Sequence, residues 1–259
     1  MKFNGRNIYI GKNVHLGKGV RIGDNTTIYD NVSIGDGSVI CDNCSLGEPL
    51  QRYYSDDSYV NPELRIGENC FIRSHAVIYA GASIGASTQI AHWALIRENT
   101  VLGEYCMVGV HVHILDGCQI GSYVRFHSYN TIGENSEIGD FVFFYPLAVI
   151  TTDPNPPSNL LLRCRIGKYT QVATSSVLMP GVEIGEHCLV AAQSKVAGKF
   201  ADYSLIAGSP AKNIVDLREA PIINQETGKR QYPWPYNFSR NMPWEGIGYD
   251  TWLKNQENI

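Results

Sequence analysis

A large apolar residue recurs at every sixth position through the middle of the chain. From Ile66 to Ile150 the pattern holds at fifteen successive positions without interruption. The residue four places after each of these is usually small or medium-sized, as at Cys70, Ala76 and Ala82. A period of six belongs neither to a helix, whose period is about 3.6, nor to a strand, whose period is about 2. A short fixed period is typical of a solenoid, and this one predicts a β-helix of hexapeptide repeats.

The same period extends over most of the chain, with two interruptions. It covers residues 10–46, 66–150 and 166–196, which together hold twenty-eight repeats. If three repeats close one turn, the chain forms about nine coils. Strands on successive coils lie about 4.8 Å apart, so the predicted prism is roughly 45 Å long.

Three repeats per turn divide the repeats among three corners of the prism. At one corner the next residue is glycine in all nine cases, after Leu16, Ile34, Ile66, Ile84, Leu102, Ile120, Ile138, Ile166 and Ile184. Glycine accepts strained turn conformations that other residues resist, so we expect this corner to be purely structural. The other two corners carry large polar or aromatic side chains at the same place, such as Tyr79, Arg97 and His127.

Both interruptions leave the prism from the same corner, after Leu46 and after Ile150. The first, residues 47–65, is polar and aromatic, and the second, residues 151–165, is rich in proline. Long loops on a rigid scaffold are where binding and catalytic residues usually lie. The alternative is that both loops are surface excursions without a function.

Acidic residues gather at the corner from which both loops leave. Acidic residues that lie two places after the apolar position of this corner include Glu48, Glu98, Asp116 and Glu134. The last three are eighteen residues apart, so we expect them to stack on successive coils about 4.8 Å from one another. Like charges this close raise the pKa of at least one carboxyl group, which suits a general base or a site for a substrate amine. The alternative is a solvated acidic edge that salt screens.

The chain divides into a repeat domain, residues 1–215, and a C-terminal tail, residues 216–259. The tail holds three of the four tryptophans and shows no period. A segment with this much aromatic surface does not float free in water. We expect it to wrap over the coils of its own prism or of a neighbouring subunit, or alternatively to form a lid over a ligand.

Charge and hydropathy exclude several classes of partner. The net charge is −4 and there is no basic block, so binding to nucleic acid is not expected. The sequence has no apolar run of eighteen residues and no apolar N-terminal segment, which argues against a membrane span or a secretion signal. Five of the seven cysteines fall at the small packing position of a repeat, where a free thiol behaves as a small hydrophobe. We therefore expect a cytoplasmic protein with unbridged cysteines.

The repeat tract, over roughly residues 8–215, resembles the left-handed β-helix acyltransferases, and the ending AGSPAKNI is similar to their terminal motif. The resemblance implies an all-β fold, a left-handed parallel β-helix. It also implies a homotrimer with active sites between adjacent prisms. The acyl donor in this family is acyl-CoA or acyl carrier protein, and the resemblance implies no metal.

Two segments of the first half are similar to the UDP-N-acetylglucosamine acyltransferases of that family. The loop CSLGEPLQRYYSDD looks like the one that grips the sugar nucleotide, which places Gln51 and Arg52 at the substrate. The stretch VGVHVHILDGCQIG looks like the catalytic segment, whose first histidine matches His113 and whose second falls on Asp116. The DPNPP loop and the AGSPAK ending instead resemble the N-acetyltransferases of nucleotide-linked amino sugars, which supply bacterial surface polysaccharides.

Together these features predict an acetyl-CoA-dependent N-acetyltransferase that acts on a dTDP- or UDP-linked amino sugar. Amide formation from a thioester needs an uncharged amine, a proton acceptor and a hydrogen-bond donor to the oxyanion. Asp116, His113 and Glu134 are the candidate catalytic residues. Backbone N–H groups near Gly117 or Gly133 would stabilise the oxyanion. Alternatively, the departing thiolate takes the proton and the carboxylates only orient the amine.

Ligand binding is assigned to residues around these candidates. The substrate-binding candidates are Glu48, Gln51, Arg52, His111 and Asn135. His111 is expected to share a column with His75, Trp93 and Tyr129, because these residues are eighteen apart. The alternative for either outward histidine is an ordinary surface residue.

The acyl donor is assigned to the later coils. Ala173 and Ala191 place small side chains at a second corner, where they leave room for a pantetheine arm. The resemblance implies that Lys212 lies near the CoA phosphates. The alternative for all three is plain coil packing or surface.

Three other functions remain open. A sugar O-acetyltransferase of the same fold would use a histidine to deprotonate a hydroxyl group. A zinc lyase like the γ-type carbonic anhydrases needs histidines five residues apart, but the residue five after His111 is Asp116. A non-catalytic prism would leave the two loops beside the acidic corner without an explanation.

Overall fold

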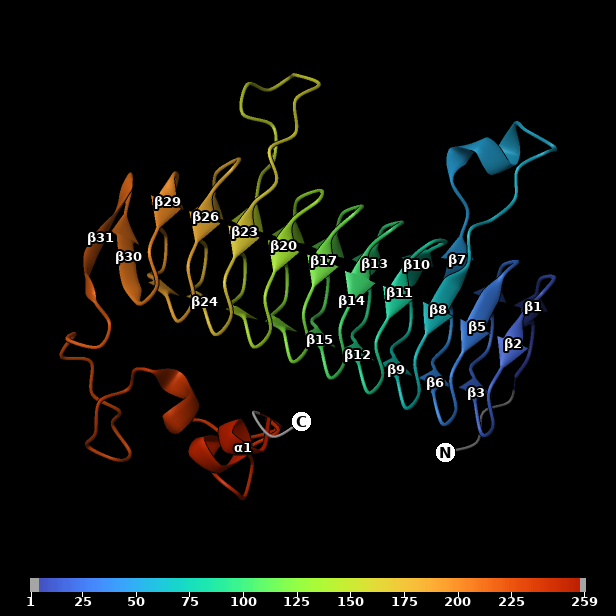
Figure 1. The fold of residues 1–259 in the computed structure, drawn as a ribbon. Coiled ribbons are helices and arrows are strands. Elements are labelled where there is room, and N and C mark those ends of the chain that lie inside the picture. Colours follow the sequence, from blue (N-terminus) through green and yellow to red (C-terminus); the bar gives the residue numbers. More distant parts are fainter. Residues whose placement is uncertain (1–4, 257–259) are drawn as a thin grey trace.

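The computed structural model describes residues 5–256. The chain winds into a three-sided prism whose faces are three sheets, called A, B and C here (Figure 1). Every third strand joins the same sheet, and paired residues of neighbouring coils are eighteen apart, as Leu95 and His113 are. The three-repeat turn is therefore confirmed, and so is the parallel β-helix.

The strands are short, and each sheet takes them in chain order. Sheet A contains β1 (Tyr9–Ile10), β4 (Thr27–Ile28), β7 (Ser45–Glu48), β10 (Val77–Tyr79), β13 (Leu95–Ile96), β16 (His113–Ile114), β19 (Thr131–Ile132), β22 (Val149–Ile150), β25 (Val177–Leu178) and β28 (Lys195–Val196). Sheet B contains β2 (His15–Leu16), β5 (Val32–Ile34), β8 (Leu64–Ile66), β11 (Ser83–Ile84), β14 (Val101–Leu102), β17 (Gln119–Ile120), β20 (Glu137–Ile138), β23 (Arg165–Ile166), β26 (Glu183–Ile184) and β29 (Lys199–Phe200). Sheet C contains β3 (Arg21–Ile22), β6 (Val39–Ile40), β9 (Phe71–Ile72), β12 (Gln89–Ile90), β15 (Met107–Val108), β18 (Arg125–Phe126), β21 (Phe143–Phe144), β24 (Gln171–Val172), β27 (Leu189–Val190), β30 (Ser204–Gly208) and β31 (Ala211–Asp216).

The core is a column of repeat residues inside the prism. The recurring apolar side chains, such as Ile78, Ile96 and Ile114, are completely buried, and β-branched residues suit this pleated packing. The small position four places later is buried as well. Cys106, for example, has no exposed surface, and burial raises the pKa of its thiol to about 12. All seven cysteines are unbridged, as the sequence predicts.

The helix has more coils than the predicted nine. The six-residue period slips by two at Gly198, after which β29 and β30 continue the stack, with Phe200 paired to Ile184 and Ile206 paired to Val190. The sheets consequently hold ten, ten and eleven strands. The final strand, β31, is antiparallel to β30 and closes the last coil. The sequence reading lost the pattern at this slip, because it required an unbroken period.

The glycine-lined corner, between sheets B and C, is structural for a different reason than expected. The backbone at Gly35 and Gly139 is not in the left-handed region. Instead, a Cβ atom at Gly35 would lie 2.6 Å from the backbone nitrogen of Glu68 on the next coil, and one at Gly139 would lie 2.8 Å from that of Lys168. Glycine is needed here because successive coils approach too closely for a side chain.

Both long loops leave the corner between sheets A and B, on the same edge of the prism (Figure 1). The first runs from β7 to β8 and contains a short 3-10 helix, η1 (Gln51–Tyr54). The second joins β22 to β23. Five strand spacings of sheet A separate β7 from β22, which is about 24 Å along the axis. The loops of one subunit therefore flank a stretch of prism rather than meeting over it.

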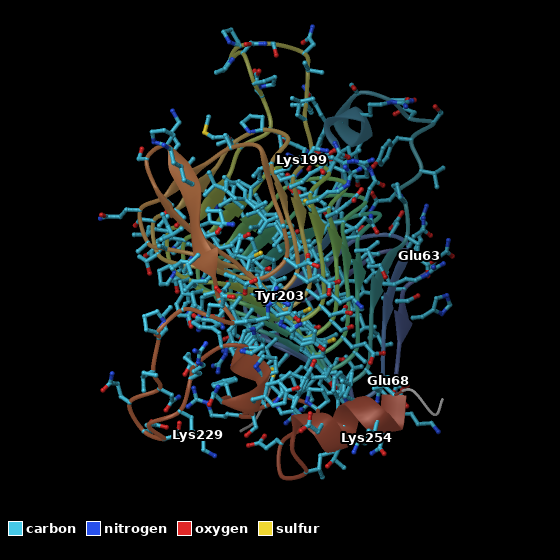
Figure 2. The ribbon with its side chains drawn as sticks, turned by 60° about the vertical axis from the view of Figure 1, so that its left-hand side comes forward. Glu63, Glu68, Lys199, Tyr203, Lys229 and Lys254 are labelled. Carbon is cyan, nitrogen blue, oxygen red and sulfur yellow. The ribbon has the colours of Figure 1, made fainter. Side chains whose placement is uncertain are left out.

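The C-terminal tail packs on its own prism. It contains a 3-10 helix, η2 (Trp234–Tyr236), and a helix, α1 (Tyr249–Gln256), which lies below the coils in Figure 1 and carries Lys254 in Figure 2. Trp234 and Trp244 are each only 1% exposed, and they form a second apolar cluster with prism residues Phe141 and Phe143. This agrees with the expectation that the tail wraps over the coils.

The tail covers the middle of a stack of rings at the corner between sheets B and C, where Phe141 and Tyr169 are buried while Tyr105 at one end is 48% exposed. Six side chains stack there on successive coils with centroids 4.6–5.1 Å apart, and we call Tyr105, Tyr123, Phe141, Tyr169, His187 and Tyr203 the covered ladder. The indole N–H of Trp234 donates to the carbonyl of Tyr169 at 2.7 Å, which anchors the tail to the ladder.

Within residues 5–256, the helices are too short or too polar to cross a membrane.

Candidate active site

Asp116 lies in the turn after β16, on the edge from which both loops leave. Its side chain is half-buried. Its backbone carbonyl accepts a hydrogen bond from the N–H of Asn135 on the next coil at 2.9 Å, which fixes the two turns against each other. Within residues 5–256 the Asp116 carboxylate forms no hydrogen bond and no ion pair. The turn thus presents two carboxylate oxygens that a ligand can reach.

Glu98, one coil earlier, is paired with a cation instead of repelling its acidic neighbours. Arg97 donates to the Glu98 carboxylate from Nε at 2.6 Å and from Nη2 at 2.7 Å. Burial pushes the pKa of Glu98 upward, but the hydrogen bonds and charge of Arg97 outweigh burial and hold that pKa below its ordinary value. The expected rise in carboxyl pKa is therefore wrong at Glu98, because a guanidinium on the same coil stabilises the ionised form.

The other two acidic residues also have partners. Thr152, at the start of the second loop, donates a hydrogen bond to Glu134 at 2.6 Å, so this carboxylate ties the loop to the prism. The hydroxyl of Ser45 donates to Glu48. Three strand spacings of sheet A, about 14 Å, separate Glu48 from the coil of Asp116. Only the acids of three adjacent coils are brought together.

The two loop residues assigned to the substrate lie apart from Asp116 within one subunit. Gln51 and Arg52 lie on η1 in the first loop, and both residues are exposed. Arg52 pairs with Asp56 at 2.5 Å inside the same loop. The described part of the chain contains no hydrogen bond or ion pair between this loop and Asp116.

His113 and His111 lie on the coil of Asp116 but in different surroundings. His113 points outward from β16 and is exposed. His111 occupies the corner between sheets C and A, where its ring stacks on Trp93 at 5.3 Å and on Tyr129 at 5.2 Å. His75 extends the stack beyond Trp93 at 5.0 Å. The predicted column is confirmed, and we call His75, Trp93, His111 and Tyr129 the exposed ladder.

One of the two proposed oxyanion donors is already used. The N–H of Gly117 donates to the carbonyl of Glu98 at 3.1 Å, so it is not available to a ligand. The N–H of Gly133 donates no hydrogen bond within residues 5–256. The sheet is incomplete beside it, since β19 pairs with β22 through Thr131 alone. Gly133 is buried, however, so a ligand reaches its N–H only where the second loop leaves the prism.

The donor-binding candidates lie toward the C-terminal end. Ala173 and Ala191 are half-buried after β24 and β27. Lys212 is exposed on β31, five strand spacings of sheet C or more from the coil of Asp116, which is about 24 Å. Within one subunit, Lys212 therefore cannot contact a group that is bound at Asp116.

Sequence reasoning missed three features of the structure. It did not predict that Arg97 pairs with Glu98 or that Thr152 holds Glu134, because spacing does not tell which neighbour a side chain bonds. It also missed the covered ladder, although the eighteen-residue spacing of Tyr105, Tyr123 and Phe141 was available as a signal.

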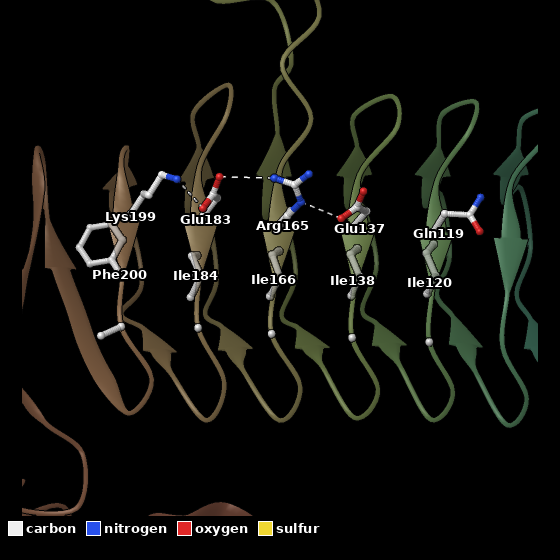
Figure 3. A pocket seen from close by; sticks show the side chains of 15 residues that line it. Gln119, Ile120, Glu137, Ile138, Arg165, Ile166, Glu183, Ile184, Lys199 and Phe200 are labelled. Atoms are coloured by element: carbon white, nitrogen blue, oxygen red, sulfur yellow. Dashed lines mark hydrogen bonds and ion pairs between the residues drawn. The ribbon is translucent and has the colours of Figure 1, made fainter.

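A wide groove on sheet B is lined by acidic and basic side chains that pair with one another. It has a volume of about 880 Å³ and is crossed by alternating acids and bases (Figure 3). Arg165 bridges Glu137 at 2.8 Å and Glu183 at 3.4 Å, and Lys199 pairs with Glu183 at 2.8 Å. This face is a charge-paired surface and contributes none of the candidate residues.

In the described residues, no group of three or more His, Cys, Asp and Glu side chains is arranged to hold a metal ion.

Comparison with curated proteins gives relatives that match part of the chain, of which one is described here. The carnitine operon protein CaiE of Proteus sp. is 35% identical over 75 residues, which is 28% of this chain and 38% of that protein. The chain therefore spans well under half the length of this relative.

Solved structures of low sequence identity also match. Among them are the UDP-N-acetylglucosamine O-acyltransferase LpxA of Moraxella catarrhalis (20% identity, TM-score 0.34, 81% of this chain and 66% of that one) and the Arabidopsis UDP-N-acetylglucosamine acyltransferase (18%, TM-score 0.35, 97% and 88%). A third is the acetyltransferase domain of PglB from Neisseria gonorrhoeae in complex with acetyl coenzyme A (17%, TM-score 0.34, 54% and 55%).

The family comparison follows the repeat tract itself. The family model described as bacterial transferase hexapeptide (six repeats) matches residues 13–48, 99–134 and 163–198, and the hexapeptide repeat of succinyl-transferase matches residues 63–88. Together these matches span 134 of the 259 residues. They cover coils on both sides of each long loop. The chain accordingly belongs to the hexapeptide-repeat acyltransferase family of left-handed parallel β-helix proteins.

Proposed function

We propose that this chain is an acyl-CoA-dependent N-acyltransferase that transfers an acetyl group to the amino group of a nucleotide-linked amino sugar. The observation that carries the proposal is the Asp116 carboxylate, which forms no hydrogen bond or ion pair within residues 5–256 and lies on the loop-bearing edge, on a coil between the two long loops. A carboxylate in this position can accept a proton from an amine and hold that amine by a hydrogen bond. The membership of a family of acyl-transferring enzymes supports the same reaction.

In the proposed reaction, the lone pair of the uncharged amine attacks the thioester carbonyl carbon. A C–N bond forms, the C–S bond breaks, and CoA leaves as the thiol. Asp116 takes the proton that the nitrogen loses and passes it to the thiolate, so the enzyme returns to its starting state. In this proposal the N–H of Gly133 stabilises the oxyanion. Glu134, held by Thr152, orients the amine from the next coil.

Substrate binding is assigned to the surroundings of this edge. In the proposal Glu48, Gln51 and Arg52 of the first loop and Asn135 hold the sugar nucleotide, and His111 forms a side wall. The pantetheine arm follows Ala173 and Ala191, with Lys212 near the phosphates. Glu48 lies about 14 Å and Lys212 about 24 Å or more from the coil of Asp116 along one prism, so the proposal requires that adjacent subunits bring these groups together.

That requirement supports a homotrimer with a site between neighbouring prisms. Sheet A offers a surface for such contacts, because Val77, Leu95, Val149 and Val177 point outward from it and are only partly buried in the single chain. The exposed ladder borders the same sheet. We further propose that the enzyme acts in the cytoplasm, where acetyl-CoA and activated sugars are available, and supplies polysaccharide synthesis.

A second candidate is O-acetylation of a sugar. The observation that favours it is His113, whose exposed imidazole lies on the coil of Asp116. A hydroxyl is far less acidic than a protonated amine and needs a stronger base, which an imidazole provides.

The test is a turnover assay that measures thiol release from acetyl-CoA with a panel of dTDP- and UDP-linked amino sugars, and with the matching hydroxy sugars. N-acylation predicts thiol release only with the amino sugars, and mass spectrometry then finds the acetyl group on nitrogen. Release with the hydroxy sugars would favour the second candidate. If no sugar releases thiol and the protein retains no CoA, both are wrong.

A further inference from the structure

A second groove, on the outer face of sheet C, differs from the charge-paired groove of sheet B. It consists of two adjoining hollows of about 400 and 310 Å³ that share Phe71, Gln89, Met107 and Arg125. Arg240 and Asn241 of the tail close one side. We call this the arginine groove, because Arg73, Arg125 and Arg240 all line it.

The three arginines of this groove lack a carboxylate partner. No Asp or Glu lines either hollow, and none of the three arginines forms an ion pair within residues 5–256. Most other arginines of the prism, such as Arg97 and Arg165, are paired with acids. On the tail side, Glu245 accepts a hydrogen bond from the backbone N–H of Asn241 at 2.8 Å. The groove is consequently a concentration of uncompensated positive charge.

Aromatic rings hold the three guanidinium groups in place. Arg73 lies over the ring of Phe71 at 4.6 Å. Arg125 and Arg240 lie on the same tail ring, Phe238, at 5.5 and 5.9 Å. Arg125 Nη2 also donates to the carbonyl of Arg240 at 3.0 Å. Such stacking leaves the guanidinium edges available, and those edges recognise phosphate through paired hydrogen bonds.

The fold thus brings the positive charges of Arg125 and Arg240 together. Burial, and then the neighbouring charge of Arg240, lower the pKa of Arg125. Burial and the charge of Arg125 likewise lower the pKa of His127, at the same end of the groove. Holding cations together in a partly buried place costs stability, unless an anion binds there.

The shape of the groove suits a ligand longer than one phosphate. The column that follows sheet C reads Arg73, Ala91, Gly109 and His127, with large side chains at the ends and small ones in the middle. Three strand spacings separate the ends, which is about 14 Å. Ala91 and Gly109 leave a trough, and Met107 and Phe71 beside it offer an apolar surface for the uncharged part of a ligand.

We propose that the arginine groove binds the diphosphate of a nucleotide, with Arg73, Arg125 and Arg240 as its phosphate-binding residues. The site is completed by the tail, since Arg240 and the ring that holds it come from that segment. The choice of a nucleotide over another polyphosphate rests on the proposed function. Both proposed ligands, the sugar nucleotide and CoA, carry a diphosphate, so either is a source of this group.

The test is titration calorimetry of the full chain with UDP, dTDP, CoA and inorganic pyrophosphate. The variants are Arg73→Ala and Arg240→Ala, which alter exposed side chains, with Arg65→Ala on sheet B as the matched control. Each groove variant should raise the Kd for a diphosphate nucleotide about tenfold to a hundredfold, the loss expected for a charged hydrogen bond, while the control leaves it unchanged. Weakened UDP or dTDP binding assigns the groove to the sugar nucleotide, and weakened CoA binding assigns it to the donor.

Two results would overturn the inference: equal Kd values for the groove variants and the control, or no binding of any of the four probes at millimolar concentration. Because the measurement needs no turnover, it is separate from the proposed reaction. Arginine-dependent binding without thiol release would sink the reaction and leave the groove. Normal turnover with unchanged Kd values would leave the proposed reaction standing and overturn the proposal for the arginine groove.

Discussion

Two columns of stacked rings run along this prism, one on the corner between sheets B and C and the other on the corner between sheets C and A. Both use the corner residue with positive φ, and neighbouring rings lie 4.6–5.3 Å apart in both. In the covered ladder Phe141 and Tyr169 are buried under the tail at 5% and 8% exposure. In the exposed ladder Trp93 and Tyr129 remain 50% and 55% exposed.

The difference shows that one repeat-derived device serves two purposes. A left-handed corner is costly for a bulky residue, and stacking against the coils above and below offsets part of that cost in both ladders. Only the covered ladder gains the further stabilisation of removing its rings from water. The exposed ladder keeps an apolar surface along one edge of sheet A, where the proposed trimer contact lies, and Asp116 is on the opposite edge of that sheet. The arginine groove runs between the two ladders.

The largest predicted effect distinguishes a tail tryptophan from a ladder tryptophan. Trp244→Ala removes a fully buried ring, so it should lower the free energy of unfolding by about 3–5 kcal/mol. Trp93→Ala removes a half-exposed ring and should cost less than about 1 kcal/mol in the dilute single chain. Urea denaturation of both variants measures this. Equal losses would mean that the ring of Trp93 is as buried in solution as the ring of Trp244, for example because another subunit covers the exposed ladder.

A smaller effect is expected at the acidic edge, which lies across sheet A from the exposed ladder. Glu98 has a folded pKa below its unfolded value, so its contribution to stability is present above the unfolded pKa and is lost as the pH falls through the folded pKa. Glu98→Gln should therefore cost about 1 kcal/mol or less at pH 7, and the difference from the parent should vanish at acidic pH. Denaturation from pH 7 down to pH 3 measures it. A difference that stays constant across this range would contradict the pairing with Arg97.

The smallest effect concerns a histidine inside the covered ladder. Burial lowers the pKa of His187, and its Nδ1 is buried without a hydrogen bond. A lowered histidine pKa means that the unfolded chain binds the proton more readily, so His187 costs stability as the pH falls below the unfolded value of about 6.5. His187→Phe keeps the stack and should flatten the fall in melting temperature between pH 7 and pH 5. A melting temperature that falls as steeply in His187→Phe as in the parent would contradict this assignment.

Much of the fold was accessible to sequence reasoning because the period is a property of the sequence itself. The recurring apolar positions, of which Ile78, Ile96 and Ile114 are examples, determine which sheet each repeat joins, where the corners lie and from which corner both loops leave. The coil count fell short where two residues are missing from the period at Gly198, since a slip in phase looks like the end of a repeat. The covered ladder was also in the sequence, but the tail that covers it has no period to interpret.

The site was less accessible, because spacing places residues on a corner and does not choose their partners. It grouped Asp116 with Glu98 and Glu134, and these do lie on adjacent coils. It could not show that Arg97 neutralises Glu98, or that the N–H of Gly117 is already bonded. The arginine groove lay beyond sequence reasoning altogether, since Arg240 reaches Arg125 only through the fold of the tail.

The most direct test of the proposed reaction compares thiol release by the parent chain, Asp116→Asn and Glu104→Gln with acetyl-CoA and the best amino sugar. Glu104 is an exposed carboxylate on the glycine-lined corner and serves as the matched control. If Asp116 accepts the proton, Asp116→Asn should lower kcat by about 100-fold to 10,000-fold, while Glu104→Gln keeps it within twofold of the parent. Full kcat in Asp116→Asn would contradict the assignment of this edge as the active site.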